Sequence, residues 1–60
     1  MDEKYVVQHL KKLCDVMYQE GETFARYSKS RNKYIFGCIR PFGDVTKNIV
    51  DKSIAIFLVV

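Results

Sequence analysis

The last seven residues of this 60-residue chain, Ile54–Val60, contain no polar side chain. The run is rich in β-branched residues and contains a phenylalanine, a composition typical of strands rather than helices. Because alternate side chains of a strand face opposite sides of a sheet, we expect Ala55, Phe57 and Val59 on one face and the other four residues on the opposite face. Both faces are then apolar, and a chain of this length has few elements with which to cover them.

The composition is that of a folded globular protein. Hydrophobic residues make up 48% of the sequence, so disorder is not expected, and residues 1–60 are expected to form a single small domain. Two cysteines are too few for a disulfide-dense secreted scaffold. The acidic start of the chain is unlike a secretory signal, and the terminal apolar run is far shorter than the ~20 residues that span a bilayer. We expect a soluble, cytoplasmic protein with no membrane partner.

Residues 3–20 have the periodicity of an amphipathic helix. Its apolar stripe consists of Val6, Leu10, Leu13, Cys14 and Met17. Asp2 is the expected N-cap, and Gly21 is expected to end the helix.

Two segments that follow have strand character. Residues 23–28 favour a strand, although Phe24 would also continue the helical stripe if the helix ran on past Gly21. Residues 33–40 alternate, with Tyr34 facing the same way as Phe36 and Cys38.

Turn residues separate these segments. A polar turn at residues 28–32 contains Asn32, which tolerates the left-handed conformation, and residues 41–44 form the clearest turn of the chain. Gly37, inside the second strand, indicates a bulge or a close approach of backbone.

Residues 45–52 fit either one helical turn or an irregular strand. With the terminal run as the last strand, the sequence predicts an α+β fold. One N-terminal amphipathic helix packs on a small antiparallel sheet of about three strands, which is either open or curled into a small barrel.

No residue pattern indicates catalysis, a metal site or a cofactor. His9 and Cys14 are five positions apart and point in different directions on a helix, and no spacing typical of zinc ligands occurs. Cys14 and Cys38 are interpreted as small apolar core residues. An intramolecular disulfide between them requires the helix to pack across the second strand, and a reducing compartment disfavours it. We therefore expect a protein that is not an enzyme and has no small-molecule substrate.

The middle of the chain is basic and rich in aromatic residues. Between residues 23 and 43 the sequence contains basic residues and no acidic one, and aromatic residues are interleaved with them over 24–42. Basic groups contact phosphates, and exposed rings stack on unpaired bases. The candidate residues for binding RNA or single-stranded DNA are Arg26, Lys29, Arg31, Lys33, Tyr34 and Arg40.

Short segments resemble two RNA-binding families. Residues 34–39, followed by Pro41, resemble the RNA-contacting strand of cold-shock domains. Residues 37–39, followed by Phe42, Asp44 and residues 48–50, are similar to the first motif of Sm-like proteins, and that resemblance implies a base-contacting role for Asn48. Both resemblances imply a small RNA-binding barrel. The leading helix departs from the first pattern and Gly43 from the second, and neither family is assigned.

The leading hypothesis is a small non-enzymatic regulator or inhibitor that contacts another protein and self-associates. One helix covers only one side of a small sheet, so the other side needs a partner, a second copy or curling of the sheet. We expect the interface at Ala55, Phe57 and Val59. Nucleic-acid binding through residues 24–42 is the alternative.

Overall fold

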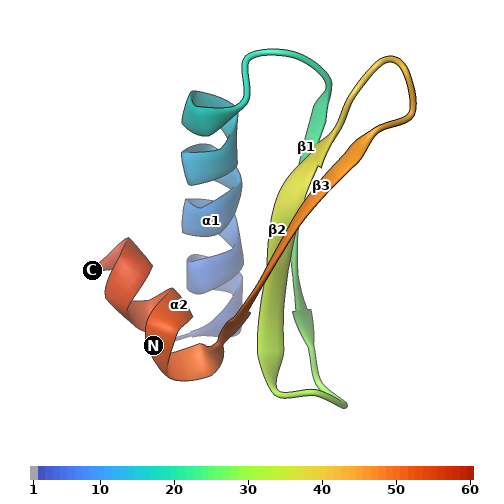
Figure 1. Ribbon diagram of the computed structural model, residues 1–60. Helices are drawn as coiled ribbons and strands as arrows, with labels where there is room; N and C mark the ends of the chain where they lie inside the picture. Colours follow the sequence, from blue (N-terminus) through green and yellow to red (C-terminus); the bar gives the residue numbers. More distant parts are fainter. Residues whose placement is uncertain (1) are drawn as a thin grey trace.

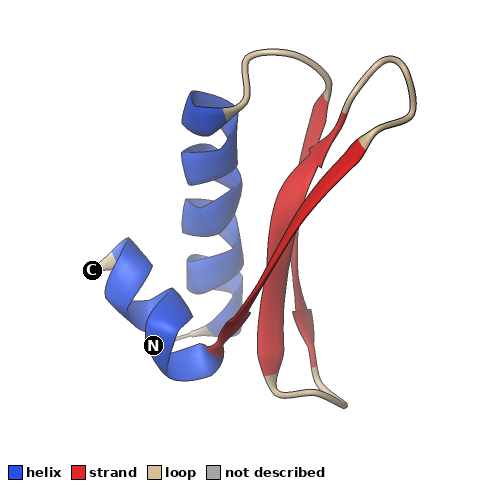
Figure 2. Cartoon of the chain, viewed as in Figure 1, coloured by secondary structure: helices blue, strands red, loops and turns tan. Residues whose placement is uncertain are grey.

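The computed structural model describes residues 2–60, which form two helices and three strands. In chain order these are α1 (Glu3–Met17), β1 (Glu22–Ser28), β2 (Lys33–Ile39), β3 (Val45–Asp51) and α2 (Lys52–Val59). The strands form one antiparallel sheet in the order β1-β2-β3, and both helices lie on one side of it (Figures 1 and 2). The predicted α+β architecture is confirmed. The sheet is not closed into a barrel, so the barrel alternative, on which both family resemblances depend, is wrong.

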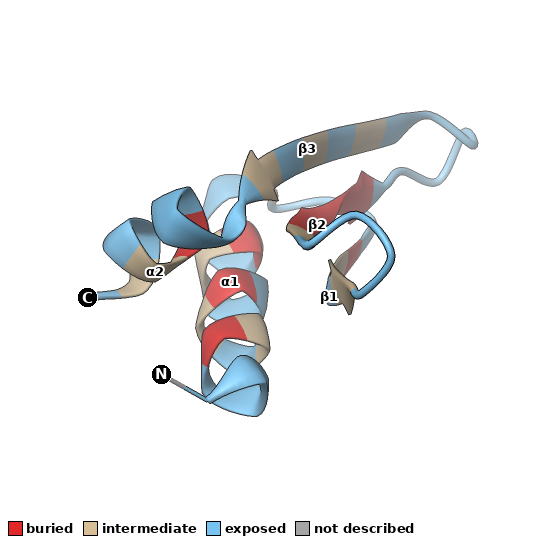
Figure 3. Ribbon diagram, turned by 90° about the horizontal axis from the view of Figure 1, so that it is seen from below, coloured by how far each residue is buried: buried red, intermediate tan, exposed pale blue. Residues whose placement is uncertain are grey.

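The core lies between α1 and β2. Val6, Leu10 and Cys14 occupy successive turns of one helix face and are fully buried. They pack in one cluster with Tyr34 and Phe36, which point to the same side of β2 as predicted. Figure 3 shows this buried side of α1 turned toward the sheet. Three of the five residues of the predicted stripe therefore hold the two elements together, whereas Leu13 is only half-buried and lies outside this cluster.

The helix α1 ends at Met17, earlier than predicted. The N–H of Tyr18 donates a hydrogen bond to the carbonyl of Cys14 at 2.8 Å, and the chain then turns toward β1. Met17 is 52% exposed, so it does not extend the buried stripe. Gly21 has a φ of 91°, a conformation that favours glycine, but it lies just before β1 and not at the end of the helix. A Cβ there would lie 2.4 Å from the carbonyl oxygen of Ile39, which excludes a side chain.

Both predicted turns are present between the strands. Asn32 adopts the left-handed conformation with a φ of 55°. In the second turn the N–H of Arg40 donates to the carbonyl of Asp44 at 2.8 Å, and the N–H of Gly43 donates to the carbonyl of Arg40 at 2.9 Å. Gly43 has a φ of 91°. This is a three-residue hairpin turn with glycine at its left-handed position, and it makes β3 fold directly back on β2.

The C-terminal run forms the helix α2, so the predicted terminal strand is wrong. The third strand is instead β3, within the segment that the sequence left open between helix and strand. The tight hairpin places β3 beside β2 along its whole length, and this position in the sheet is no longer open to the terminal run. A short apolar run fits a buried strand and a buried helix equally by periodicity. Here it follows β3 directly, with no residues left for a turn back along the sheet, and it packs Ala55 into the core as a helix.

The helix α2 is anchored on α1 by a small residue. Ala55 is fully buried in the core cluster, and Ile56 and Val59 are half-buried against it. An alanine at this position lets the two helix backbones approach closely. Figure 1 shows α2 beside the N-terminal half of α1.

Gly37 marks a close approach between β2 and β3. The register is continuous along both strands, so the close approach is the correct one of the two predicted alternatives and there is no bulge. A Cβ on Gly37 would lie 1.8 Å from the carbonyl oxygen of Thr46. We expect Gly37→Ala to lower the free energy of unfolding by at least about 2 kcal/mol in urea denaturation, because backbone must move to admit the methyl group.

Gly43→Ala is the matched control for this experiment. A Cβ on Gly43 meets nothing within 4 Å, so only the positive φ is penalised, at about 1–2 kcal/mol. A smaller loss in the free energy of unfolding for Gly37→Ala than for Gly43→Ala would contradict the close approach of β2 and β3 at Gly37.

Candidate protein-binding surface

The face of the sheet turned away from the two helices carries no covering element from residues 2–60 (Figure 3). We call it the open sheet face. Its side chains follow from the strand register and are Glu22, Phe24, Arg26, Ser28, Lys33, Ile35, Ile39, Val45, Lys47, Ile49 and Asp51. The opposite face carries the core residues.

Apolar side chains run across the open sheet face. Ile35 is only 2% exposed, because its register partners Arg26 and Ile49 flank it on both sides. Ile49 is itself 47% exposed, and Ile39 and Val45 are 45% and 55% exposed. These side chains are in contact with water over about half of their surface, so covering them would be favourable.

Charged residues separate the apolar side chains on this face. Lys33 and Asp51 are opposite each other in the register and form an ion pair at 3.2 Å. Arg26 and Lys47 are exposed, and no ion pair of either is found among the described residues. The face therefore offers a partner both apolar contact and free cationic groups.

The predicted interface of Ala55, Phe57 and Val59 does not form one surface. These residues share a face only in a strand. In α2, Ala55 and Val59 are one turn apart and point into the core, whereas Phe57 points away and is 80% exposed. Exposed apolar side chains do lie on the outside of α2, at Ile54, Phe57 and Leu58, and form a second apolar surface.

The predicted nucleic-acid-binding residues are divided between two ends of the sheet. Arg26 is on the open sheet face, and Lys29 and Arg31 belong to the β1–β2 turn, where all three are exposed. Lys33 lies beside that turn but is ion-paired with Asp51. The fold thus brings most of the basic candidates to one end.

Two of the candidate residues are separated from this group. Arg40 lies in the β2–β3 turn at the other end of the sheet, next to Phe42, which is 95% exposed. Tyr34 is 1% exposed and belongs to the core, where its ring centroid lies 4.7 Å from that of Tyr27. Tyr34 therefore presents no exposed ring for stacking on a base. Burial also raises the pKa of its hydroxyl.

The role implied for Asn48 by the Sm resemblance is not matched by its position. Its amide nitrogen donates to the carbonyl of Phe36 and to the hydroxyl of Tyr18, both at 3.2 Å. Asn48 thus joins β3 to the segment after α1 on the covered side of the sheet.

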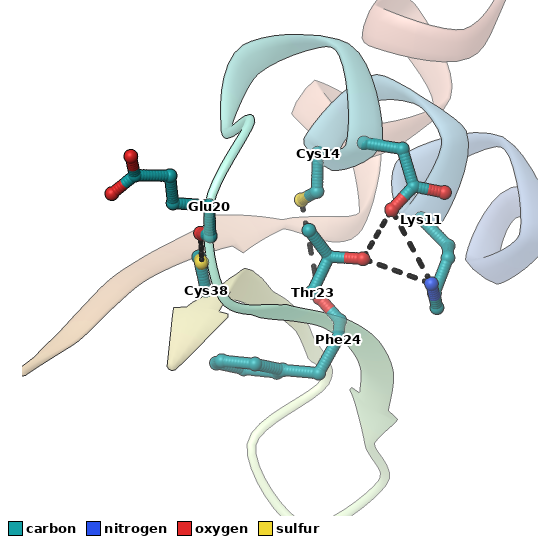
Figure 4. A network of polar contacts seen from close by, with 7 residues as sticks. Lys11, Cys14, Glu20, Thr23, Phe24 and Cys38 are labelled. Atoms are coloured by element: carbon teal, nitrogen blue, oxygen red, sulfur yellow. Dashed lines mark hydrogen bonds and ion pairs between the residues drawn. The ribbon is translucent and has the colours of Figure 1, made fainter. Parts of the chain in front are cut away.

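A polar network ties α1 to β1 (Figure 4). The hydroxyl of Thr23, which is almost buried, donates to the carboxylate of Asp15 and accepts a hydrogen bond from Lys11 Nζ at 2.8 Å. Lys11 also pairs with Asp15 at 3.4 Å. The bond from Thr23, supported by Lys11, lowers the pKa of Asp15 below its usual range, so the carboxylate stays ionised at neutral pH.

The two cysteines are free and buried. The Cys38 thiol donates to the carbonyl of Glu20 at 2.9 Å, and the Cys14 thiol contacts the carbonyl of Phe24 at 3.9 Å. Burial raises the pKa of the Cys14 thiol, and the neighbouring Asp15 carboxylate raises it further. A buried thiol with a raised pKa is a poor nucleophile, and the position of Cys14 is that of a core residue.

His9 is occupied within its own helix. Its Nδ1 is hydrogen-bonded to the carbonyl of Tyr5 at 2.9 Å, and the ring centroids of His9 and Tyr5 lie 4.0 Å apart. Among residues 2–60 no group of three His, Cys, Asp or Glu side chains is placed to hold a metal ion.

Comparisons with models of protein families, with curated proteins and with solved structures find no match to this chain. In the described part of the chain, no helix has the length and apolar character needed to cross a bilayer.

The interpretation of the sequence missed the apolar residues of β3 on the open sheet face. The sequence gives no clear signal here, because Val45 and Ile49 share their side of β3 with Lys47 and Asp51. The adjacent Ile49 and Val50 also fit a helical turn. A strand assignment for this segment would have identified Val45 and Ile49 as surface apolar residues.

The different surroundings of Ala55 and Phe57 can be tested by mutation. We expect Ala55→Asp to lower the free energy of unfolding by about 3 kcal/mol or more, because it places a charge in the contact between α1 and α2. Phe57→Ser should change it by no more than about 0.5 kcal/mol. Urea denaturation of the two variants and of the wild type measures both changes. Equal costs would favour the strand arrangement of the terminal run.

Proposed function

We propose that this protein is a small, non-enzymatic regulator or inhibitor that works by contact with protein chains and that self-associates. The observation that carries the proposal is the open sheet face, on which Ile39, Val45 and Ile49 remain half exposed. An apolar surface of this kind, bordered by charged residues, is typical of a protein-binding site.

The chemistry of the reactive side chains supports a role in binding. Cys14 is buried and burial raises its pKa, so its thiol is not prepared for nucleophilic catalysis. The two free cysteines also support our proposal of a cytoplasmic, reducing location.

Self-association can be tested by dilution. We expect sedimentation of the wild-type chain to give a mass near twice 7.0 kDa at high concentration, falling toward the monomer on about a hundredfold dilution. The thermal midpoint should fall in parallel, because the association stabilises only the folded chain.

The variant Ile49→Asp provides a second arm. Ile49 is 47% exposed, so the charge should leave the monomer folded by circular dichroism while weakening the dimer. A wild-type chain that sediments as a monomer at every concentration, with a constant thermal midpoint, would contradict the proposal.

Nucleic-acid binding is the second candidate function, supported by the position of Arg31. Arg31 lines an open hollow of about 520 Å³ next to the β1–β2 turn, together with Asp51, Lys52 and Ser53 at the start of α2. Cations beside a helix N-terminus favour phosphate, and Lys29 and Arg26 lie nearby along the same turn and strand.

Titration with single-stranded RNA and with duplex DNA tests this second function. Binding should weaken steeply between about 50 mM and 200 mM salt, and Arg31→Ala should weaken it for every sequence alike. Arg40→Ala, at the opposite end of the sheet, is the matched control and should have little effect. Absence of binding at the lower salt concentration would eliminate this candidate.

A further inference from the structure

The strand β3 has an outer edge with no strand beside it in the described structure. The sheet has two edge strands, β1 and β3, and α1 lies against only one of them. It packs on the covered face of β1, where Lys11 and Asp15 reach the side chain of Thr23, but no Cα atom of α1 lies within 8 Å of one in β3. Figure 3 shows β3 extending away from both helices, with α2 beyond its C-terminal end. The outer edge of β3 is therefore the one farther from α1, and open edges pair readily with other strands.

The turn before β3 determines which backbone groups point outward. The N–H of Arg40 bonds to the carbonyl of Asp44, so these opposed residues form a hydrogen-bonded pair. Such pairs alternate along an antiparallel ladder, and the next ones involve Thr46, Asn48 and Val50. The intervening residues Lys47 and Ile49 then direct their N–H and C=O groups away from β2, toward the open edge.

We infer that the self-association in the proposed function, on which this inference rests, occurs by antiparallel pairing of β3 with β3 of a second copy. The two-fold axis passes through Ile49. Outward-pointing groups can pair only with outward-pointing groups, so Ile49 faces Ile49 and Lys47 faces Asp51 of the other chain. Two three-stranded sheets then form one continuous six-stranded sheet.

The side chains on the open sheet face select this register. The central row across the joined sheet becomes Arg26–Ile35–Ile49 and its symmetric copy, which covers the exposed flank of both Ile49 side chains. On each side of this row, Asp51 lies between Lys33 of its own chain and Lys47 of the other. The exposed Lys47 thereby gains a carboxylate partner, twice by symmetry.

Neighbouring registers lose this complementarity. An axis through Lys47 places two lysines opposite each other, which is destabilising. An axis through Asn48 places Lys47 opposite Ile49 and Val45 opposite Asp51, so that each charge faces an apolar side chain. Only the axis through Ile49 matches apolar with apolar and acid with base.

Exchange of the two charges tests the register. Lys47→Glu and Asp51→Lys should each raise the dimer dissociation constant by about tenfold or more, because like charges then meet twice across the axis. In an equimolar mixture of the two variants both pairs are opposite in charge again, so a mixed dimer should form in sedimentation experiments. Lys29→Glu, the same charge change in the β1–β2 turn, is the matched control and should dimerise as the wild type does.

Cross-linking provides a readout that does not depend on the charges. In a hydrogen-bonded pair the two Cα atoms are about 5.5 Å apart, within the range of a disulfide. Ile49→Cys should therefore form a covalent dimer with oxidised glutathione, whereas Val45→Cys on the same face should not. Circular dichroism of each variant establishes that the monomer is folded.

The outcomes separate this inference from the proposed function. Recovery of the dimer in the mixture, together with cross-linking at residue 49 alone, supports the β3 pairing. A wild-type dimer that is unaffected by the charge exchange, or an Ile49→Cys variant that stays monomeric while the wild type dimerises, overturns the pairing and leaves self-association standing. A wild-type chain that is always monomeric overturns both.

Discussion

The structure depends on the packing of one helical stripe against one side of one strand. Val6, Leu10 and Cys14 fill the space over Tyr34 and Phe36. The remaining elements are positioned relative to this contact between α1 and β2. The hairpins add β1 and β3 on either side of β2, and α2 then packs on the remaining flank of α1. Because both helices lie in a single layer, the fold covers one face of the sheet and leaves the other open.

The parts of the fold that were predictable are those with a local cause. The stripe of α1, the alternation of Tyr34 with Phe36, and the left-handed Asn32 and Gly43 turns all follow from residues close together in sequence. The assignment of the terminal run failed because its cause is not local. The run follows β3 without an intervening turn and packs on α1 as a helix, with Ala55 as the residue small enough to lie against α1.

The candidate site was predictable in kind but not in position. The sequence showed that one helix could not cover two apolar faces, and the structure leaves one face open. The residues on that face were not identified, since the terminal run was taken as the uncovered strand and residues 45–51 show no apolar–polar alternation. The basic residues were likewise divided by the hairpin geometry, which sends Arg40 to the end of the sheet opposite Arg31.

An exposed edge beside an apolar face is a hazard for any small sheet protein, since it invites indiscriminate pairing. A lysine near the middle of an edge strand is a common protection, because burying it against apolar residues is costly. Lys47 has this position in β3, and it penalises the registers that place it opposite Ile49 or another Lys47. The same charge is favourable in the one register that supplies Asp51. A single side chain can thus restrict an aggregation-prone edge to one defined, symmetric partner, since specificity arises from the arrangements that it excludes.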